Sequence, residues 1–241
     1  MKSIWFMCSA AAENAERGMR NAEWGRRGCL LLSLLLLLLA GCASVQPVVK
    51  VGLVGPFEGA QRAIGYDVIY SARLAVREIN AAGGIGGYRV ALAALDDSGD
   101  PELAQQVAAA LALDPAVMVV IGHWTAETTA VAAPIYAQAG LPFIPAGAPP
   151  IGAFPPAQLP ADFHAAYEAV TPFDETAGPY AGAAYDAFQL IWQAMAAVVE
   201  SEGVVGRTAV GRTAVGRALV NRTYEGMTGL VYLRASEEEG R

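Results

Sequence analysis

The chain has 241 residues, of which 54% are hydrophobic and 16% charged, and its formal net charge is −7 at pH 7. This acidic balance argues against nucleic acid as a partner, because nucleic-acid binding needs a basic surface. All of the cysteines (Cys8, Cys29 and Cys42) precede the part that is expected to fold. We therefore expect no disulfide and no thiolate metal site in that part.

Residues 1–41 have the pattern of an export signal. Two arginines precede a leucine-rich stretch, Cys29 to Ala40, which is shorter than the roughly 20 helical residues needed to span a bilayer. The small residues before Cys42 resemble a bacterial lipobox, which implies that Cys42 is lipidated and that 42–47 is a tether. A short membrane anchor is the alternative. Met19 is a more usual start for such a signal, so we interpret the residues before it as a mis-assigned start.

The stretch that follows predicts a strand, a helix and a second strand. Val48–Val54 is an apolar run typical of a buried strand, and Tyr66–Asn80 places apolar residues at helical spacing. Glycines end the helix, and Tyr88–Leu95 is the second strand. A unit of this kind indicates parallel strands joined by a right-handed crossover.

The alternation continues for two more units. Asp100 and Pro101 are typical of a helix start, as N-cap and first helical residue. Val117–Ile121 is a third strand, a helix through Pro134 follows, and Leu141–Ile144 is a fourth strand. The predicted fold class is therefore α/β, with a doubly wound, mostly parallel, Rossmann-like sheet.

The pattern changes after residue 150. We expect 151–179 to be an irregular connection with one short helix, and 180–235 to hold C-terminal helices and a last strand at Thr228–Leu233. Residues 236–241 are an acidic tail.

A five-residue repeat occupies residues 206–220. Five residues turn a helix by about 500°, so successive copies point in different directions. We expect no shared working surface from this repeat, and duplication of a short DNA segment is the simpler explanation.

Several segments resemble the type I periplasmic binding proteins of the branched-chain amino-acid kind, which are receptors of ABC importers. The segments are Ile79–Gly87, Asp96-Asp97 with Asp100-Pro101, Val119–His123, Ala132–Tyr136, Ala184–Ala187 and Gly226–Gly229. The resemblance implies a fold of two lobes that close on a ligand. Here 48–150 matches the N-terminal part of lobe one and 180–235 the return to it, so the second lobe is expected to be largely missing.

The resemblance also implies where a ligand would lie, in the loops after the third and fourth strands. These contacts map onto Trp124, Thr125, Ala126, Gly147 and Ala148. Free N–H groups at a helix N-terminus attract a carboxylate, and Trp124 is either an apolar wall or a packing residue. Ala126 and Pro149 stand where hydroxyl side chains are common in the family, and Ile64 stands where an aromatic residue is common. Contacts from lobe two have no counterpart, so we expect weak binding.

No catalytic, metal-binding or cofactor-binding set is expected. His123 is interpreted as structural, Asp96 and Asp97 as loop and cap residues, and Gly83–Gly87 follows a helix where a phosphate loop would follow a strand. The leading hypothesis is a cell-envelope lipoprotein that binds amino acids or similar small carboxylates for an ABC permease and touches the membrane only through its lipid. The alternatives are a non-functional remnant of such a receptor and an exported Rossmann-like enzyme, although the enzyme's glycine fingerprint is absent.

Overall fold

The computed structural model describes residues 46–203 and 209–233. The predicted signal peptide, the predicted lipidation site at Cys42, most of the tether and the acidic tail at 236–241 lie outside the described residues. So does the first part of the five-residue repeat. Within the described residues, no helix has both the length and the apolar composition that crossing a bilayer requires.

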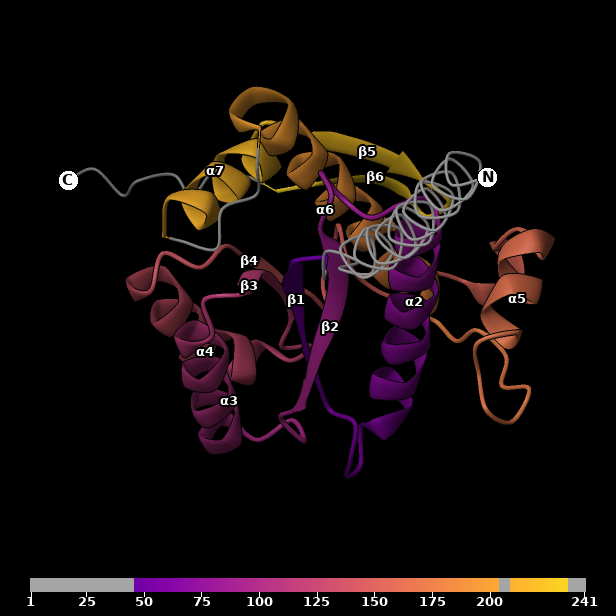
Figure 1. The fold of residues 1–241 in the computed structure, drawn as a ribbon. Coiled ribbons are helices and arrows are strands. Elements are labelled where there is room, and N and C mark those ends of the chain that lie inside the picture. Colours follow the sequence, from indigo (N-terminus) through magenta and orange to yellow (C-terminus); the bar gives the residue numbers. More distant parts are fainter. Residues whose placement is uncertain (1–45, 204–208, 234–241) are drawn as a thin grey trace, which may run out of the picture. The chain divides into compact units, whose positions relative to one another are not determined.

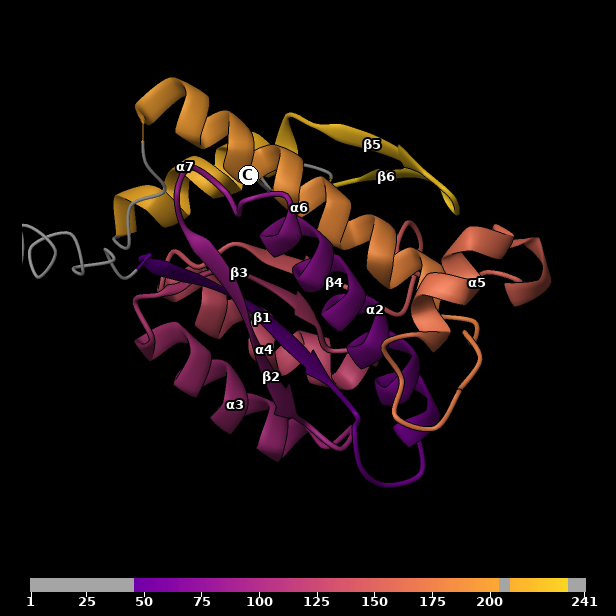
Figure 2. The same ribbon diagram turned by 45° about the vertical axis from the view of Figure 1, so that its right-hand side comes forward.

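Four parallel strands form the central sheet, in the order β2-β1-β3-β4 (Figure 2). They are β1 (Val48–Gly55), β2 (Arg89–Asp96), β3 (Val117–Gly122) and β4 (Phe143–Pro145). β3 is buried along its whole length and β1 along most of it. Strands covered on both faces read as continuous apolar runs, because neither side of the sheet meets water. The prediction of an α/β fold with a doubly wound parallel sheet is confirmed.

Two pairs of helices cover the two faces of this sheet (Figures 1 and 2). The first pair is α2 (Arg62–Ala81) with α6 (Ala181–Glu202), and the second is α3 (Pro101–Leu113) with α4 (Ala126–Gln138). Neighbouring residues of β1 point to opposite faces of the sheet and pack against different helix pairs. Leu53 belongs to the cluster under α2 and α6, whereas Val54 belongs to the cluster under α3 and α4. This division follows from the two-residue side-chain period of a strand.

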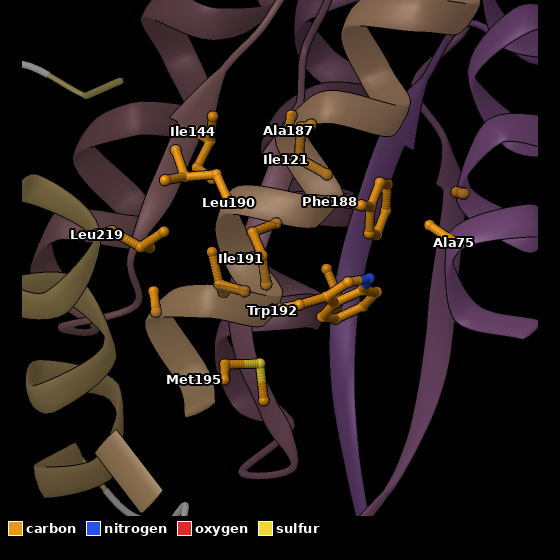
Figure 3. Packing of buried hydrophobic residues seen from close by; sticks show 14 of the residues in the cluster. Ala75, Ile121, Ile144, Ala187, Phe188, Leu190, Ile191, Trp192, Met195 and Leu219 are labelled. Atoms are coloured by element: carbon orange, nitrogen blue, oxygen red, sulfur yellow. The ribbon is translucent and has the colours of Figure 1, made fainter. Parts of the chain in front are cut away.

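Helix α6 provides the largest share of the buried core. Its alanines let the helix approach the sheet, and its larger side chains fill the space beside them. Figure 3 shows Phe188, Leu190, Ile191 and Met195 within this cluster, and none of the four is exposed to solvent. Truncating a buried side chain of this size to alanine costs about 2–5 kcal/mol of folding free energy in typical cores.

The predicted start of α3 is confirmed, whereas that of α2 differs from the structure. Asp100 is the N-cap of α3, since its Oδ1 accepts from the N–H groups of Glu102 at 2.7 Å and Leu103 at 3.0 Å, as predicted. Helix α2, however, begins at Arg62 rather than Tyr66. Arg62 and Ala63 are exposed and the buried Gly65 has no side chain, so no apolar periodicity marks the first turn.

The fourth strand also differs from its prediction. β4 begins at Phe143, whereas Leu141 still belongs to the turn that follows α4, where its N–H donates to Tyr136 O at 2.9 Å. Leu141 is buried all the same, in the α3–α4 layer, which explains why it reads as part of an apolar strand.

The segment between β4 and α6 contains a short 3₁₀ helix and α5 (Ala161–Glu168). Phe163 and Tyr167 of α5 pack against Tyr70 and Leu74 of α2, outside the main core. None of residues 152–180 joins the parallel sheet, and the described residues contain one such sheet.

Helix α7 (Ala209–Val220) is built from the repeat, and part of it packs into the core. Val215 is completely buried, whereas Val220, the equivalent residue of the next copy, is 39% exposed. The rotation expected between copies is therefore present. The copies therefore share no common surface, and the copy that contains Val215 contributes to the core.

The chain then forms an antiparallel hairpin, β5 (Thr223–Gly226) and β6 (Gly229–Tyr232), where only one last strand was predicted. The buried carboxylate of Asp186 in α6 holds the turn of this hairpin. It accepts from the N–H groups of Met227 at 3.2 Å and Thr228 at 2.8 Å and from Thr228 Oγ1 at 2.6 Å.

Candidate functional site

A cleft of about 1130 Å³ opens at the carboxyl ends of β3 and β4. Trp124, Thr125, Ala126, Gly147 and Ala148, the residues predicted from the sequence, all line it. The structure therefore brings together two loops that are more than twenty residues apart in the sequence. In an open parallel sheet, this edge is where ligands usually bind.

The opposite wall comes from the β5–β6 hairpin, which the sequence analysis did not connect with the site. Thr228, Leu230 and Tyr232 line this wall. The hairpin follows the fourth strand by some eighty residues in the sequence, and only the tertiary structure brings the two together. A local sequence pattern therefore could not predict this contact. Ile64, by contrast, does not line the cleft and packs against the core.

The first turn of α4 faces the cleft. Thr125 is its N-cap, and the Thr125 hydroxyl oxygen accepts from the N–H of Thr128 at 3.2 Å. The two threonine hydroxyls also lie 2.9 Å apart, so the cap already engages the Thr125 side chain. The N–H groups of Ala126 and Glu127 have no acceptor within the helix, because they precede the first helical hydrogen bond. They give this end of the cleft a positive potential that suits an anion.

Gly147 has a positive φ of 91°, and a β-carbon there would overlap the backbone of Trp124. Its N–H donates to Ile151 O at 2.8 Å, which closes the loop. Only glycine allows the two cleft loops to approach this closely.

Trp124 combines both roles considered for it. Its side chain is 5% exposed and belongs to the main core cluster, and the residue also lines the cleft. The indole meets the Tyr180 ring edge-on, with centroids 5.5 Å apart. Trp124 is therefore a packing residue whose position also shapes the cleft.

His123 immediately precedes these residues and is completely buried. Its Nδ1 lies 3.0 Å from Asp97 Oδ2, and its Nε2 lies 3.0 Å from the hydroxyl of Tyr136. An ionised carboxylate can only accept, so Nδ1 carries the proton and, in the neutral imidazole, Nε2 accepts from Tyr136. Burial, followed by the charge of Asp97, raises the pKa of Tyr136. The interpretation of His123 and Asp97 as structural residues agrees with these contacts.

Asp96 has the loop role expected of it. Burial opposes its ionisation, but hydrogen bonds from Ser98, Phe57 and Glu58 outweigh burial and lower its pKa. The Phe57 N–H donates to Asp96 Oδ1 at 2.7 Å, which ties the loop after β1 to the end of β2. Within the described ranges, no cluster of three or more His, Cys, Asp and Glu side chains forms a metal site.

Comparison with known proteins finds one family that is similar to part of this chain. Residues 48–158 match the family model of the periplasmic binding proteins. An amino acid binding protein of Pseudomonas aeruginosa is 33% identical over 116 residues, which are 48% of this chain and 31% of that protein. A Leu/Ile/Val-binding protein homolog of Brucella abortus is 35% identical over 108 residues, which are 45% of this chain and 28% of that protein.

Over this region the chain is similar to the type I periplasmic binding proteins of the branched-chain amino-acid family. The fold agrees: the branched-chain amino acid transporter substrate binding protein LivJ of Streptococcus pneumoniae, solved with isoleucine, superposes with a TM-score of 0.60. That alignment covers 78% of this chain and 92% of LivJ at 16% identity. The chain matches less than a third of the length of the Pseudomonas and Brucella relatives in sequence. Members of the family bind substrates for ABC transporters, are exported and are not enzymes.

Proposed function

We propose that this chain is the substrate-binding component of an ABC importer, and that it takes branched-chain amino acids or similar small carboxylates in the cleft beside α4. The observation that carries the proposal is the meeting of two loops, Trp124–Ala126 and Gly147–Ala148, at the positive end of a helix. The curated relatives are named as amino acid binding proteins, which favours the same ligand class.

The proposed receptor consists of a single lobe. One parallel sheet occupies the described residues, and the connection from 151 to 179 replaces the second lobe of the family. A ligand held from one side keeps more of its surface in water than a ligand in an enclosed site. We therefore expect dissociation constants in the millimolar range, well above those of a closed clamp.

In the cell, the chain would be exported and held at the membrane by a lipid on Cys42, facing a permease. An exported Rossmann-like enzyme remains less favoured, since no acid–base pair lines the described part of the cleft.

Calorimetric titration of the purified chain with leucine, isoleucine and valine tests the proposal. A matched pair of variants makes the test specific. Ala126→Asp places a carboxylate at the first residue of α4, where it repels an anionic ligand but suits the helix dipole. Ala161→Asp makes the same change at the first residue of α5, outside the cleft.

We expect Ala126→Asp to weaken binding at least about tenfold, as for a lost charge-assisted hydrogen bond, while Ala161→Asp leaves it unchanged. Equal affinities of the two variants would place the ligand elsewhere. Absence of binding to the unmodified chain would favour the non-functional remnant.

A further inference from the structure

The C-terminal hairpin presents a strand edge to the cleft. The hairpin residues that line the cleft, Thr228, Leu230 and Tyr232, belong to β6 or to the turn before it, and none belongs to β5. Within the described part of the chain, β5 is the only strand that pairs with β6. The edge of β6 that faces the cleft therefore has no described strand beside it.

The register of the hairpin shows which main-chain groups point to that edge. Gly226 and Gly229 flank a two-residue turn and pair with each other, so they exchange hydrogen bonds. Hydrogen-bonded and non-hydrogen-bonded pairs alternate along an antiparallel ladder, which makes the next pair, Glu225 with Leu230, a non-hydrogen-bonded one. The N–H and C=O of Leu230 therefore point away from β5, toward the cleft.

Leu230 is accessible from solvent. It is 54% exposed, and no hydrogen bond from another described segment reaches its main chain. Val231 is buried in the core, so the side chain of Leu230 points to the opposite face of the hairpin. The strand Gly-Leu-Val-Tyr carries no charge. An open edge on an uncharged, apolar strand is a template with which an extended peptide can pair.

The size of the cleft favours a ligand longer than a single amino acid. Its volume of about 1130 Å³ exceeds the range of about 300–1,000 Å³ that is typical of sites for drug-sized ligands. A second hollow of about 440 Å³ continues along the same strand, since Leu230, Tyr232 and Leu233 line both. The four residues of β6 extend over about 13 Å, which is about the length of an extended tetrapeptide.

We propose that the ligand of this cleft is a short apolar peptide that adds a strand to β6. The last residue of the peptide places its carboxylate at the first turn of α4, and the preceding residues exchange hydrogen bonds with the main chain of Leu230. A free amino acid contains no peptide group for this pairing. The inference rests on the proposed function for the carboxylate contact, and it replaces the single amino acid with a peptide.

Calorimetric titration of the purified chain compares leucine with the tetrapeptide Ala-Ala-Ala-Leu, which ends in the same residue and carboxylate. We expect the peptide to bind at least about tenfold more tightly, because it adds main-chain hydrogen bonds and buries more apolar surface. Equal or tighter binding of leucine would overturn the inference and leave the proposed function intact. This result is also expected if residues 234–241 cover the edge. If neither compound binds, both proposals are overturned.

N-methylated peptides test the strand pairing directly. Neighbouring N–H groups of an extended peptide point to opposite sides, so only one of the second and third residues can donate to β6. We expect N-methylation of one of these two residues to weaken binding about 3- to 10-fold, and N-methylation of the other to leave it within about twofold. Equal effects at the two residues would overturn the strand pairing.

Protein variants test the same contact from the other side. Leu230→Pro removes an N–H that points away from β5, a position where an edge strand tolerates proline, whereas Leu230→Ala removes the side chain and keeps the N–H. Glu225→Pro makes the matched change on the outer edge of β5, outside both hollows. We expect Leu230→Pro to bind the tetrapeptide about 3- to 10-fold more weakly than Leu230→Ala, and Glu225→Pro to stay within about twofold of the unmodified chain.

Circular dichroism establishes that the variants are folded before titration. If Leu230→Pro does not fold, the N-methylated peptides still decide the question, because they are titrated into the unmodified chain. Equal affinities of folded Leu230→Pro and Leu230→Ala for the tetrapeptide would overturn the assignment of the edge at Leu230.

Discussion

The imidazole of His123 and the carboxylate of Asp97 lie 3.0 Å apart, Nδ1 to Oδ2, and neither side chain is exposed to solvent. The contact joins the end of β3 to the loop after β2, and Trp124, the next residue after His123, lines the cleft. His123 also has a positive φ of 53°, and its carbonyl accepts from Thr129 Oγ1 at 2.5 Å. Both the side chain and the backbone carbonyl of His123 therefore hold the start of the loop that carries Trp124 and Thr125.

Removal of the third member of this network should destabilise the protein without changing its fold. Tyr136→Phe keeps the ring that packs against Phe143 but leaves Nε2 of His123 buried without a donor. We expect the free energy of unfolding in urea to fall by about 1–3 kcal/mol with an unchanged slope. Tyr66→Phe, at a residue that is 41% exposed, is the control. A loss equal to that of the control would mean that the hydrogen bond contributes nothing.

Asp67 should make the stability depend on pH. Burial raises the pKa of Asp67 to about 6, although the N–H groups of Tyr180 and Gly178 donate to it. A carboxyl whose pKa is higher in the folded state stabilises the fold below its unfolded value, near 3.8, and this contribution is lost as the pH rises through 6. Asp67 is partly exposed, so solvent screens this effect. We expect its contribution to the free energy of unfolding to differ by about 2 kcal/mol between pH 4 and pH 7.

Asp67→Asn should remove that dependence, because an amide oxygen still accepts from Tyr180 and carries no charge. Melting temperatures measured from pH 4 to pH 7 would then fall less steeply in the variant than in the unmodified chain. Asp174→Asn, at an exposed loop position, should leave the slope as it was. Parallel slopes for Asp67→Asn and the unmodified chain would contradict the prediction.

Arg212 should be important for stability although it belongs to a sequence repeat. Its guanidinium donates to three carbonyl groups at the end of α3 and the start of β3. They are Val117 O at 2.9 Å, Ala112 O at 3.1 Å and Asp114 O at 2.6 Å. Arg212→Met should cost about 2–4 kcal/mol in chemical denaturation, since it leaves carbonyl groups at a helix end unpaired. Arg217→Met changes the equivalent residue of the next copy, which is exposed, and should cost less than about 0.5 kcal/mol.

The proposed lipid anchor has its own test. We expect Cys42→Ser to abolish incorporation of labelled fatty acid and to move the protein from the membrane fraction to the soluble fraction. Cys29→Ser, within the predicted signal peptide, is the matched control and should leave both properties unchanged. Membrane association of Cys42→Ser without label would point to the alternative, a short anchor that is retained.

The sequence predicted the sheet well because each of its strands is a local apolar run between turn residues. The N-cap at Asp100 was equally readable, since the cap and the N–H groups that it binds are two and three residues apart. Both signals are local. The start of α2 was missed because two exposed residues and a glycine in its first turn contribute no apolar periodicity.

Contacts between segments that are far apart in the sequence leave no local pattern from which they could be predicted. β5 has alternating exposed and partly exposed residues and no apolar run, so it did not read as a strand. The hairpin wall of the cleft, with Thr228, Leu230 and Tyr232, was not foreseen, because no local pattern links this segment to the loops after β3 and β4. The loops on the other wall line the cleft together, and they were linked in advance only through their resemblance to a family whose ligand contacts are expected there.

The repeat in α7 makes the length of this segment as important as its composition. Gain or loss of one five-residue unit before Leu219 would rotate that side chain by about 140° around the helix axis and take it out of the core. Tandem copies in a gene expand and contract by slippage during replication. Alleles that differ by a single unit should therefore encode chains of almost identical composition but unequal folding stability.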